Sequence, residues 1–209
     1  MYHIQADCES ETVIKKSRFI TYLHPTTSEE EAKAYIQTIK KMHPDANHHC
    51  YAFIIGEHDQ IQRSNDDKEP SGTAGVPMLE CLKQRKLQDI VAITVRYFGG
   101  IKLGAGGLIR AYSGSVAQAI DEAVLTRKQT LKKCQISFAY DLIGKLDYFF
   151  RSEQIEVLDK RYEEQVTYLF LCQKIPQDEI NELSSGTIAV QFIEDMIVDL
   201  PITQTHNEK

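Results

Sequence analysis

The spacing of apolar residues changes along the chain, and each change marks an expected element. Residues 12–23 mix β-branched and aromatic side chains in partial alternation, which predicts one bent strand or two short strands. Apolar residues then recur at helical spacing from Ser28, a good N-cap followed by Glu31 three positions later, up to Pro44, so a helix is expected. Residues 50–55 form a short apolar run that predicts a strand.

The middle of the chain moves from a polar stretch to its most apolar elements. Residues 57–70 hold five acids without apolar periodicity, which indicates a long exposed loop. Helical spacing returns in residues 75–86. Residues 90–95 are an uninterrupted β-prone run, as in a central strand buried on both faces. One apolar face over residues 108–124 predicts a long helix.

The pattern then restarts and predicts a second domain. Its expected elements are a strand at 134–140, a helix at 142–152, strands at 155–158 and 164–172, a helix at 175–184 and a strand at 188–198. The order β-α-β-β-α-β is that of the ferredoxin-like split βαβ arrangement. The Lys/Arg-rich residues 126–133 are interpreted as a linker, so we expect an α+β chain with domains at 1–128 and 134–209.

Composition narrows the class of protein. The chain has 209 residues, of which 42% are hydrophobic and 26% charged, values typical of globular proteins. Its first residues lack a basic start followed by an apolar run, and no apolar stretch is long enough to cross a bilayer, so we expect a cytoplasmic protein without a membrane partner. The five cysteines are scattered and never spaced as CxxC, which predicts free thiols.

Charge is distributed unevenly. The net charge is -6, yet residues 1–127 carry 15 Lys and Arg against 16 Asp and Glu, whereas residues 128–209 carry 9 against 14. Residues 81–120 instead carry a positive charge balance. This segment has one acid, Asp89, and six basic residues, Lys83, Arg85, Lys86, Arg96, Lys102 and Arg110. This window is either an ordinary solvated face or a site for an anionic partner.

The glycine-rich run inside that window favours an anion site. Five of the eleven glycines lie between Gly99 and Gly107, directly after the best strand and before the best helix. Glycines let backbone N–H groups converge, and a helix start presents unpaired N–H groups to an anion. A tight turn is the structural alternative, and the run matches neither a P-loop nor a dinucleotide fingerprint. The candidate binding residues are Arg96, Tyr97, Phe98, Gly99, Gly100, Lys102, Gly104, Gly106, Gly107 and Arg110.

Two aromatic residues adjoin this run. Tyr97 and Phe98 follow Arg96, and exposed aromatic rings beside cations stack on single-stranded bases. Burial in the core is the competing interpretation of both rings, and it is favoured for Phe98.

Two further clusters are candidates for chemistry. Asp66, Asp67 and Glu69 could hold a hard cation, and Thr73 could be a nucleophile, although capping of the next helix is favoured for it. His48 would share one side of a strand with Cys50, where a core or loop role is favoured over a Cys/His pair.

Three sequence segments together resemble the YigZ/IMPACT family. They are AlaAsnHisHisCysTyrAlaPhe at 46–53, AspAspLysGluProSerGlyThrAlaGly at 66–75 and ArgTyrPheGlyGlyIleLysLeuGlyAlaGlyGlyLeuIleArgAlaTyr at 96–112, and LysLysSerArgPheIle at 15–20 is similar to the family's first strand. In the first two of these segments we single out the motif residues His48, Asp66, Asp67, Glu69, Pro70, Gly72 and Thr73.

The resemblance implies a fold and a function. The first domain would be an α/β sandwich like the second domain of ribosomal protein S5, and the second a ferredoxin-like domain like domain V of elongation factor G. Both relatives contact ribosomal RNA, and eukaryotic IMPACT proteins regulate translation.

Three hypotheses follow, of which only the second requires a bound metal. The first is a non-enzymatic translation-associated regulator that binds RNA or the ribosome through the glycine-rich run, with Lys15, Lys16 and Arg18 as secondary contacts and no cofactor. The second is a magnesium- and nucleotide-dependent enzyme of phosphoryl transfer or hydrolysis. The third is a purely protein-binding regulator, and the acidic second domain is a possible protein-binding surface in any of them.

Overall fold

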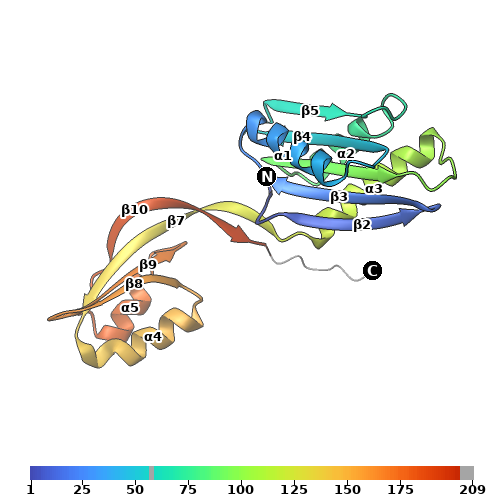
Figure 1. The fold of residues 1–209 in the computed structure, drawn as a ribbon. Coiled ribbons are helices and arrows are strands. Elements are labelled where there is room, and N and C mark those ends of the chain that lie inside the picture. The colour runs from blue at the N-terminus through green and yellow to red at the C-terminus, as the bar shows by residue number, and fades with distance from the viewer. Residues whose placement is uncertain (57–58, 203–209) are drawn as a thin grey trace. The chain divides into compact units, whose positions relative to one another are not determined.

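The structure, a computed structural model, describes residues 1–56 and 59–202 and divides into two compact units. Residues 1–127 with 200–202 belong to unit 1, and residues 128–199 form unit 2. Unit 1 contains β1 (His3–Ile4), β2 (Cys8–Ile14), β3 (Ser17–Pro25), α1 (Glu29–Met42), β4 (His48–Ile55), β5 (Ile61–Asn65), α2 (Gly75–Gln84), β6 (Ile90–Tyr97) and α3 (Ala105–Glu122), as Figure 1 shows.

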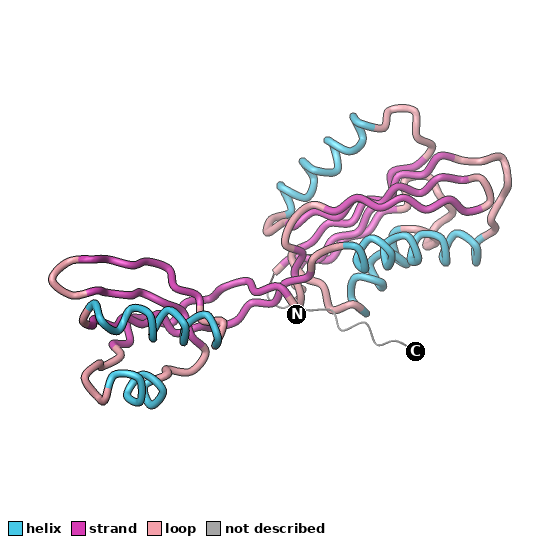
Figure 2. The backbone as a smooth tube through the Cα atoms, turned by 90° about the horizontal axis from the view of Figure 1, so that it is seen from below, coloured by secondary structure: helices cyan, strands magenta, loops and turns pink. Residues whose placement is uncertain are grey.

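The main sheet of unit 1 lies between two helical layers. Its strand order is β2-β3-β6-β4-β5, with antiparallel neighbours throughout. Figure 2 shows one helix on one side of this sheet and two on the other, and the packing identifies them as α1 opposite α2 and α3. Alternate residues of β6 enter the two cores: Val91 packs on the α1 side and Ala92 on the α2/α3 side. The expected central strand is therefore confirmed.

Local signals account for the first elements. Ser28 Oγ accepts a hydrogen bond from the Glu31 N–H at 3.2 Å and caps α1, as its sequence predicts. Residues 12–23 contribute to two strands, the second of the two alternatives, and the turn between them consists of Lys15 and Lys16 with φ angles of 45° and 66°.

The polar stretch at 57–70 is not wholly a loop. Ile61 to Asn65 form β5, which pairs with β4 at the edge of the sheet; residues 57 and 58 lie outside the described residues. Its polar side chains include Gln62, Arg63 and Ser64, so the alternation that predicts a strand is absent. Pairing with a buried neighbour, which the local pattern does not reveal, makes this segment a strand.

Unit 2 has the predicted succession of elements. It contains most of β7 (Leu125–Phe138), then a 3-10 turn (Tyr140–Leu142), α4 (Ile143–Ser152), β8 (Glu156–Tyr162), β9 (Val166–Cys172), α5 (Gln177–Ser184) and β10 (Gln191–Pro201). β9 lies between β8 and β7, and β10 pairs with the remaining side of β7. The core joins alternate residues of β7 and β9 to α4, such as Ile136, Phe170 and Phe150.

The predicted linker at 126–133 is wrong, because these residues belong to β7. Lys132 Nζ lies 3.5 Å from Asp195 Oδ1 and Lys133 Nζ lies 2.9 Å from Glu194 Oε1, so acidic side chains of β10 neutralise the basic run. Leu131 is buried within it. A charged strand that pairs with an acidic strand resembles a linker when its own sequence is considered alone.

No helix in the described part of the chain is both long and apolar enough to cross a membrane.

Candidate functional site

A buried polar cluster lies where β4, β6 and α3 meet. The antiparallel register pairs His48 of β4 with Arg96 of β6 and Phe19 of β3 with the same Arg96. Position 96 has the same parity as Ile90 and Ala92, so its side chain points to the α2/α3 side of the sheet. The register thus brings His48 and Arg96 together although 48 positions separate them.

Arg96 forms a buried ion pair with Glu69. Arg96 Nη1 lies 2.6 Å from Glu69 Oε1, and the two side chains are 5% and 4% exposed. Tyr112 of α3 donates its hydroxyl to the same oxygen at 2.8 Å. Burial raises the pKa of Tyr112, so the phenol remains a donor. Arg96 was expected to contact a phosphate from the surface, and its place in the core corrects that expectation.

His48 contributes a ring nitrogen to the cluster. Its Nδ1 lies 2.9 Å from the carbonyl oxygen of Asp67, and its Nε2 lies 3.7 Å from Glu69 Oε1. Cys50 shares the same side of β4, but its thiol donates to the carbonyl of Asp66 at 3.0 Å. Burial raises the pKa of Cys50 to about 12, so this residue stays a thiol and forms no nucleophilic pair with His48.

The acidic motif loop supports α2. Asp66 accepts hydrogen bonds from the backbone N–H groups of Gly72, Ala74 and Gly75 at 2.8 to 3.0 Å. Because those donors precede or begin α2, this carboxylate serves as its cap. The predicted capping by Thr73 is wrong: its hydroxyl donates to the Pro70 carbonyl at 2.6 Å.

Asp67 is also engaged by the backbone. Its Oδ2 accepts from the His49 N–H at 2.6 Å. No group of three or more His, Cys, Asp and Glu side chains suited to a metal ion occurs among residues 1–56 and 59–202. The carboxylates that the magnesium hypothesis needs are thus largely occupied by backbone donors.

The glycine-rich loop is anchored to the turn between β2 and β3. The N–H of Gly99 donates to Ser17 Oγ at 3.1 Å, and the N–H of Phe98 donates to Asn47 Oδ1 at 2.7 Å. A Cβ atom on Gly99 would lie 2.0 Å from the carbonyl carbon of Lys16, so only glycine permits this approach. Ser17, Asn47 and Tyr112 complete the site, and sequence reasoning missed their roles because their partners are distant in the chain.

The start of α3 is open. Gly104, with φ of 71°, is its N-cap, and no side chain caps the helix. The first N–H groups of a helix have no partner within it. A Cβ on Gly106 would meet no atom within 4 Å, so space surrounds this first turn.

A cavity of about 380 Å³ adjoins this helix start. Its lining joins the buried cluster to the loop and consists of His48, Glu69, Pro70, Arg96, Phe98, Lys102, Leu103, Gly104, Ala105 and Leu108. Phe98 at the edge of the cavity is 46% exposed, so the favoured burial of this ring is wrong. The cavity therefore has a polar floor, an aromatic rim and a helix N-terminus.

Several predicted contacts lie elsewhere or are already paired. Tyr97 lies on the opposite side of the sheet, where its hydroxyl is 2.8 Å from His43 Nδ1, because adjacent strand residues face opposite ways. Arg18 is held by two 2.9 Å hydrogen bonds to Glu11. Lys83 and Arg85 pair with Glu80 and Asp121. Only part of the basic window is thus available to a partner.

Several of the cations that stay exposed lie in or beside the motif segments. Five exposed basic residues of unit 1 near the motif segments make no ion pair with any described residue: Lys15, Lys16, Lys68, Lys102 and Arg110.

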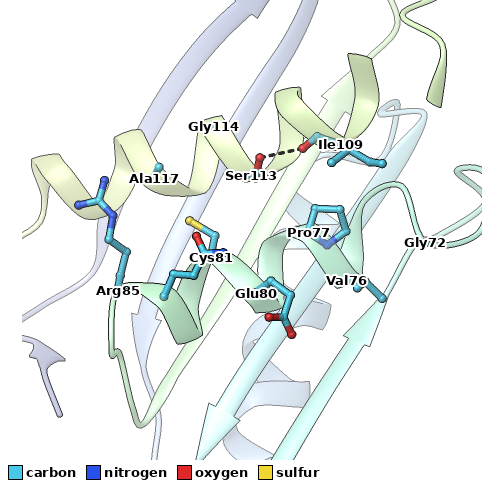
Figure 3. A pocket seen from close by; sticks show the side chains of 11 residues that line it. Gly72, Val76, Pro77, Glu80, Cys81, Arg85, Ile109, Ser113, Gly114 and Ala117 are labelled. Atoms are coloured by element: carbon cyan, nitrogen blue, oxygen red, sulfur yellow. Dashed lines mark hydrogen bonds between the residues drawn. The ribbon is translucent and has the colours of Figure 1, made fainter. Parts of the chain in front are cut away.

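A second hollow of about 630 Å³ lies between α2 and α3 (Figure 3). Val76 and Pro77 face Ile109, Ser113 and small residues of α3 across it. Val76 is 49% and Ile109 is 42% exposed, so this groove is mainly apolar.

Comparison with known proteins identifies the family. Residues 15–120 match the Impact N-terminal domain, and residues 136–187 match a domain of unknown function, DUF1949. The chain belongs to the IMPACT family. The IMPACT family member YvyE of Bacillus subtilis is 49% identical over 160 residues, which are 77% of this chain and 74% of that protein. YigZ of Escherichia coli is 37% identical over 174 residues, covering 82% and 84% of the two chains.

The IMPACT fold extends over both units. A crystal structure described as that of a hypothetical protein is 33% identical, with a TM-score of 0.59, and covers 92% of this chain and 97% of its own. An IMPACT homolog from Dictyostelium discoideum is 30% identical over 128 residues, 59% of this chain and 35% of that protein. The chain is thus a two-domain α+β member of the family.

Proposed function

We propose that this IMPACT family member is a translation-associated regulator that binds RNA, on the ribosome or free, through the surface of unit 1 around the glycine-rich loop. The resemblance to eukaryotic IMPACT proteins supports the assignment to translation, and the arrangement of the site supports RNA as the ligand. We place the protein in the cytoplasm and assign no cofactor to it.

One observation carries the proposal: the close approach of Gly99 to Lys16. It holds the turn with Lys15 and Lys16 against the loop with Lys102, although more than 80 positions separate them. Their amino groups have no acidic partner among the described residues, and the uncapped start of α3 adds backbone N–H donors. Unpaired cations beside such donors suit the phosphates of a nucleic acid.

The finer fold assignment agrees with this function. We infer that unit 1 is an α/β sandwich of the ribosomal protein S5 domain 2 type and that unit 2 is ferredoxin-like. The element order β-α-β-β-α-β and the strand order β10-β7-β9-β8 support the second assignment. Since the corresponding domains of S5 and elongation factor G contact ribosomal RNA, the ribosome is the first partner to test.

The experiment is a titration of the whole protein with ribosomal subunits and with single-stranded RNA at several salt concentrations. Binding through phosphates releases counterions, so the logarithm of the association constant should fall linearly with the logarithm of salt concentration. No binding of either ligand at low salt would overturn the proposal, and so would binding that salt leaves unchanged.

Protein binding is the second candidate function, favoured by the apolar groove between α2 and α3. Its partner would be an apolar segment of another protein. Ile109→Asp should abolish such an interaction without changing RNA affinity, and copurification under ribonuclease treatment distinguishes the two. The magnesium-dependent enzyme is disfavoured because backbone N–H groups occupy Asp66 and Asp67.

A further inference from the structure

The cavity at the start of α3 has an unused hydrogen-bond acceptor in its floor. Glu69 Oε1 accepts from Arg96 and Tyr112, whereas Oε2 accepts from no described residue. The side chain is 4% exposed and lines the cavity. Oε2 is not fully enclosed by protein, so its hydrogen bond must come from water or from a ligand in the cavity.

His48 supplies a second acceptor beside the first. A carbonyl oxygen can only accept, so the ring N–H of His48 must be on Nδ1, which contacts the Asp67 carbonyl at 2.9 Å. In the neutral imidazole Nε2 then carries a lone pair, and it lies 3.7 Å from Glu69 Oε1. The Glu69 carboxylate and a neutral His48 would thus offer two neighbouring acceptors, which suit a ligand that presents two adjacent N–H groups.

Phe98 provides a stacking surface at the edge of the same cavity. Its N–H is held by Asn47, and the Arg96 guanidinium carbon lies 5.5 Å from the ring centroid. Nearly half of Phe98 is exposed. An aromatic ring held in this way, next to Lys102 and an uncapped helix start, is suited to one unstacked base and its phosphate.

We propose that this cavity holds one unstacked guanine of an RNA strand. The base stacks on Phe98, its N1–H and N2–H groups donate to the Glu69 carboxylate and to His48 Nε2, and its phosphate lies at Lys102 and the start of α3. Guanine is the one common RNA base with two adjacent donors on its pairing edge, whereas uracil presents a single N–H between two carbonyls. This inference rests on the proposed function and adds a base preference to it.

The first test compares single-stranded RNA nonamers by fluorescence anisotropy with the full-length protein. A uridine nonamer carries one central guanosine, inosine or 2-aminopurine; inosine lacks the N2 amino group, and 2-aminopurine lacks the N1–H. Guanosine should bind about tenfold more tightly than all-uridine RNA, since only guanine offers two adjacent donors to the two acceptors. Each analogue should lose most of that gain.

The second test removes the stacking surface. Phe98→Ala should weaken binding of the guanosine nonamer about tenfold, because the stacking contact with the base is lost, and Phe98→Tyr should restore it. Ile101→Ala is the matched control, since Ile101 is an exposed apolar residue of the same loop that does not line the cavity. Urea unfolding curves of the variants check that the fold is intact.

The outcomes separate this inference from the function on which it rests. Salt-dependent RNA binding with equal affinity for guanosine, inosine and all-uridine nonamers overturns the guanine site and leaves the RNA-binding proposal standing. The same holds if Phe98→Ala changes nothing. Failure of the unaltered protein to bind any RNA or ribosomal subunit at low salt overturns both.

Discussion

Arg96 and Tyr112 both donate to one carboxylate oxygen, Glu69 Oε1, inside unit 1. The sequence places Arg96 beside a glycine-rich run, which makes it look like a phosphate contact. Its parity on β6 turns it inward instead. At the scale of the residue, this arginine therefore supports the floor of the site and leaves the exposed lysines to meet a ligand.

Removal of the Arg96 charge should destabilise the protein. Arg96→Met would leave Glu69 buried without its cation, at a cost of about 3–5 kcal/mol in the free energy of unfolding, measured by urea denaturation. Arg18→Met is the matched control, because its partner Glu11 remains solvated and the free energy should change little. Equal effects of the two substitutions would contradict the buried pair.

Burial of Cys50 should make stability depend on alkaline pH. Its pKa is raised to about 12 in the folded protein, whereas an unfolded thiol has a pKa of about 8.5. The unfolded state alone loses the proton between these values, so the free energy of unfolding falls as pH rises, by up to about 1.4 kcal/mol per pH unit. Urea denaturation of Cys50→Ala between pH 8 and 10.5, with reductant, should show a shallower fall. Identical slopes would refute this assignment.

At the scale of the element, the loop between β6 and α3 requires glycine for two different reasons. Gly99 allows close packing against the β2–β3 turn, whereas Gly104 allows the positive φ angle at the helix start. Position 106 does not require glycine for either reason, since its surroundings are open and its φ angle is not positive. The glycines of this run are therefore separable by mutation.

Gly99→Ala should be far more damaging than Gly106→Ala. A methyl group at position 99 would meet the Lys16 backbone and cost about 2 kcal/mol or more, shown by a lower urea midpoint. Alanine at position 106 should stabilise α3 by up to about 1 kcal/mol through its higher helix propensity. A harmless Gly99→Ala would mean that the turn and the loop are not in contact.

At the scale of the whole molecule, the two units differ in the surfaces that they present. The cations around the glycine-rich loop of unit 1 are unpaired, whereas Lys132, Lys133 and Lys160 of unit 2 pair with acids. On unit 2, the register places Gln135 opposite Leu169 and Ser137 opposite Thr167, so these paired positions of β7 and β9 carry no aromatic side chain. We therefore propose that RNA binds to unit 1 rather than to unit 2.

Reversal of one charge on each unit tests this assignment. Lys102→Glu and Lys145→Glu change the net charge equally, and both lysines are exposed without an ion pair among the described residues. Lys102→Glu should weaken RNA binding about tenfold or more at low salt, because a phosphate contact is replaced by repulsion, whereas Lys145→Glu should leave it unchanged. Equal losses in anisotropy titrations would indicate bulk charge rather than a site.

Local sequence alone determined most of the elements and the place of the site. The Ser28 cap, the apolar run of β6 and the glycines before α3 act within a few residues, so their consequences can be predicted without the fold. The order of elements in unit 2 could be predicted for the same reason.

Only the tertiary structure decided which charged groups remain available. The burial of Arg96, the capping of α2 by Asp66 and the pairing of residues 126–133 with β10 depend on strand register and on partners many positions away. The contact between Lys16 and Gly99 is of the same kind. Such pairings follow from how the chain folds, and they pair Arg85 and Arg96 of the basic window with acids that the local sequence does not reveal.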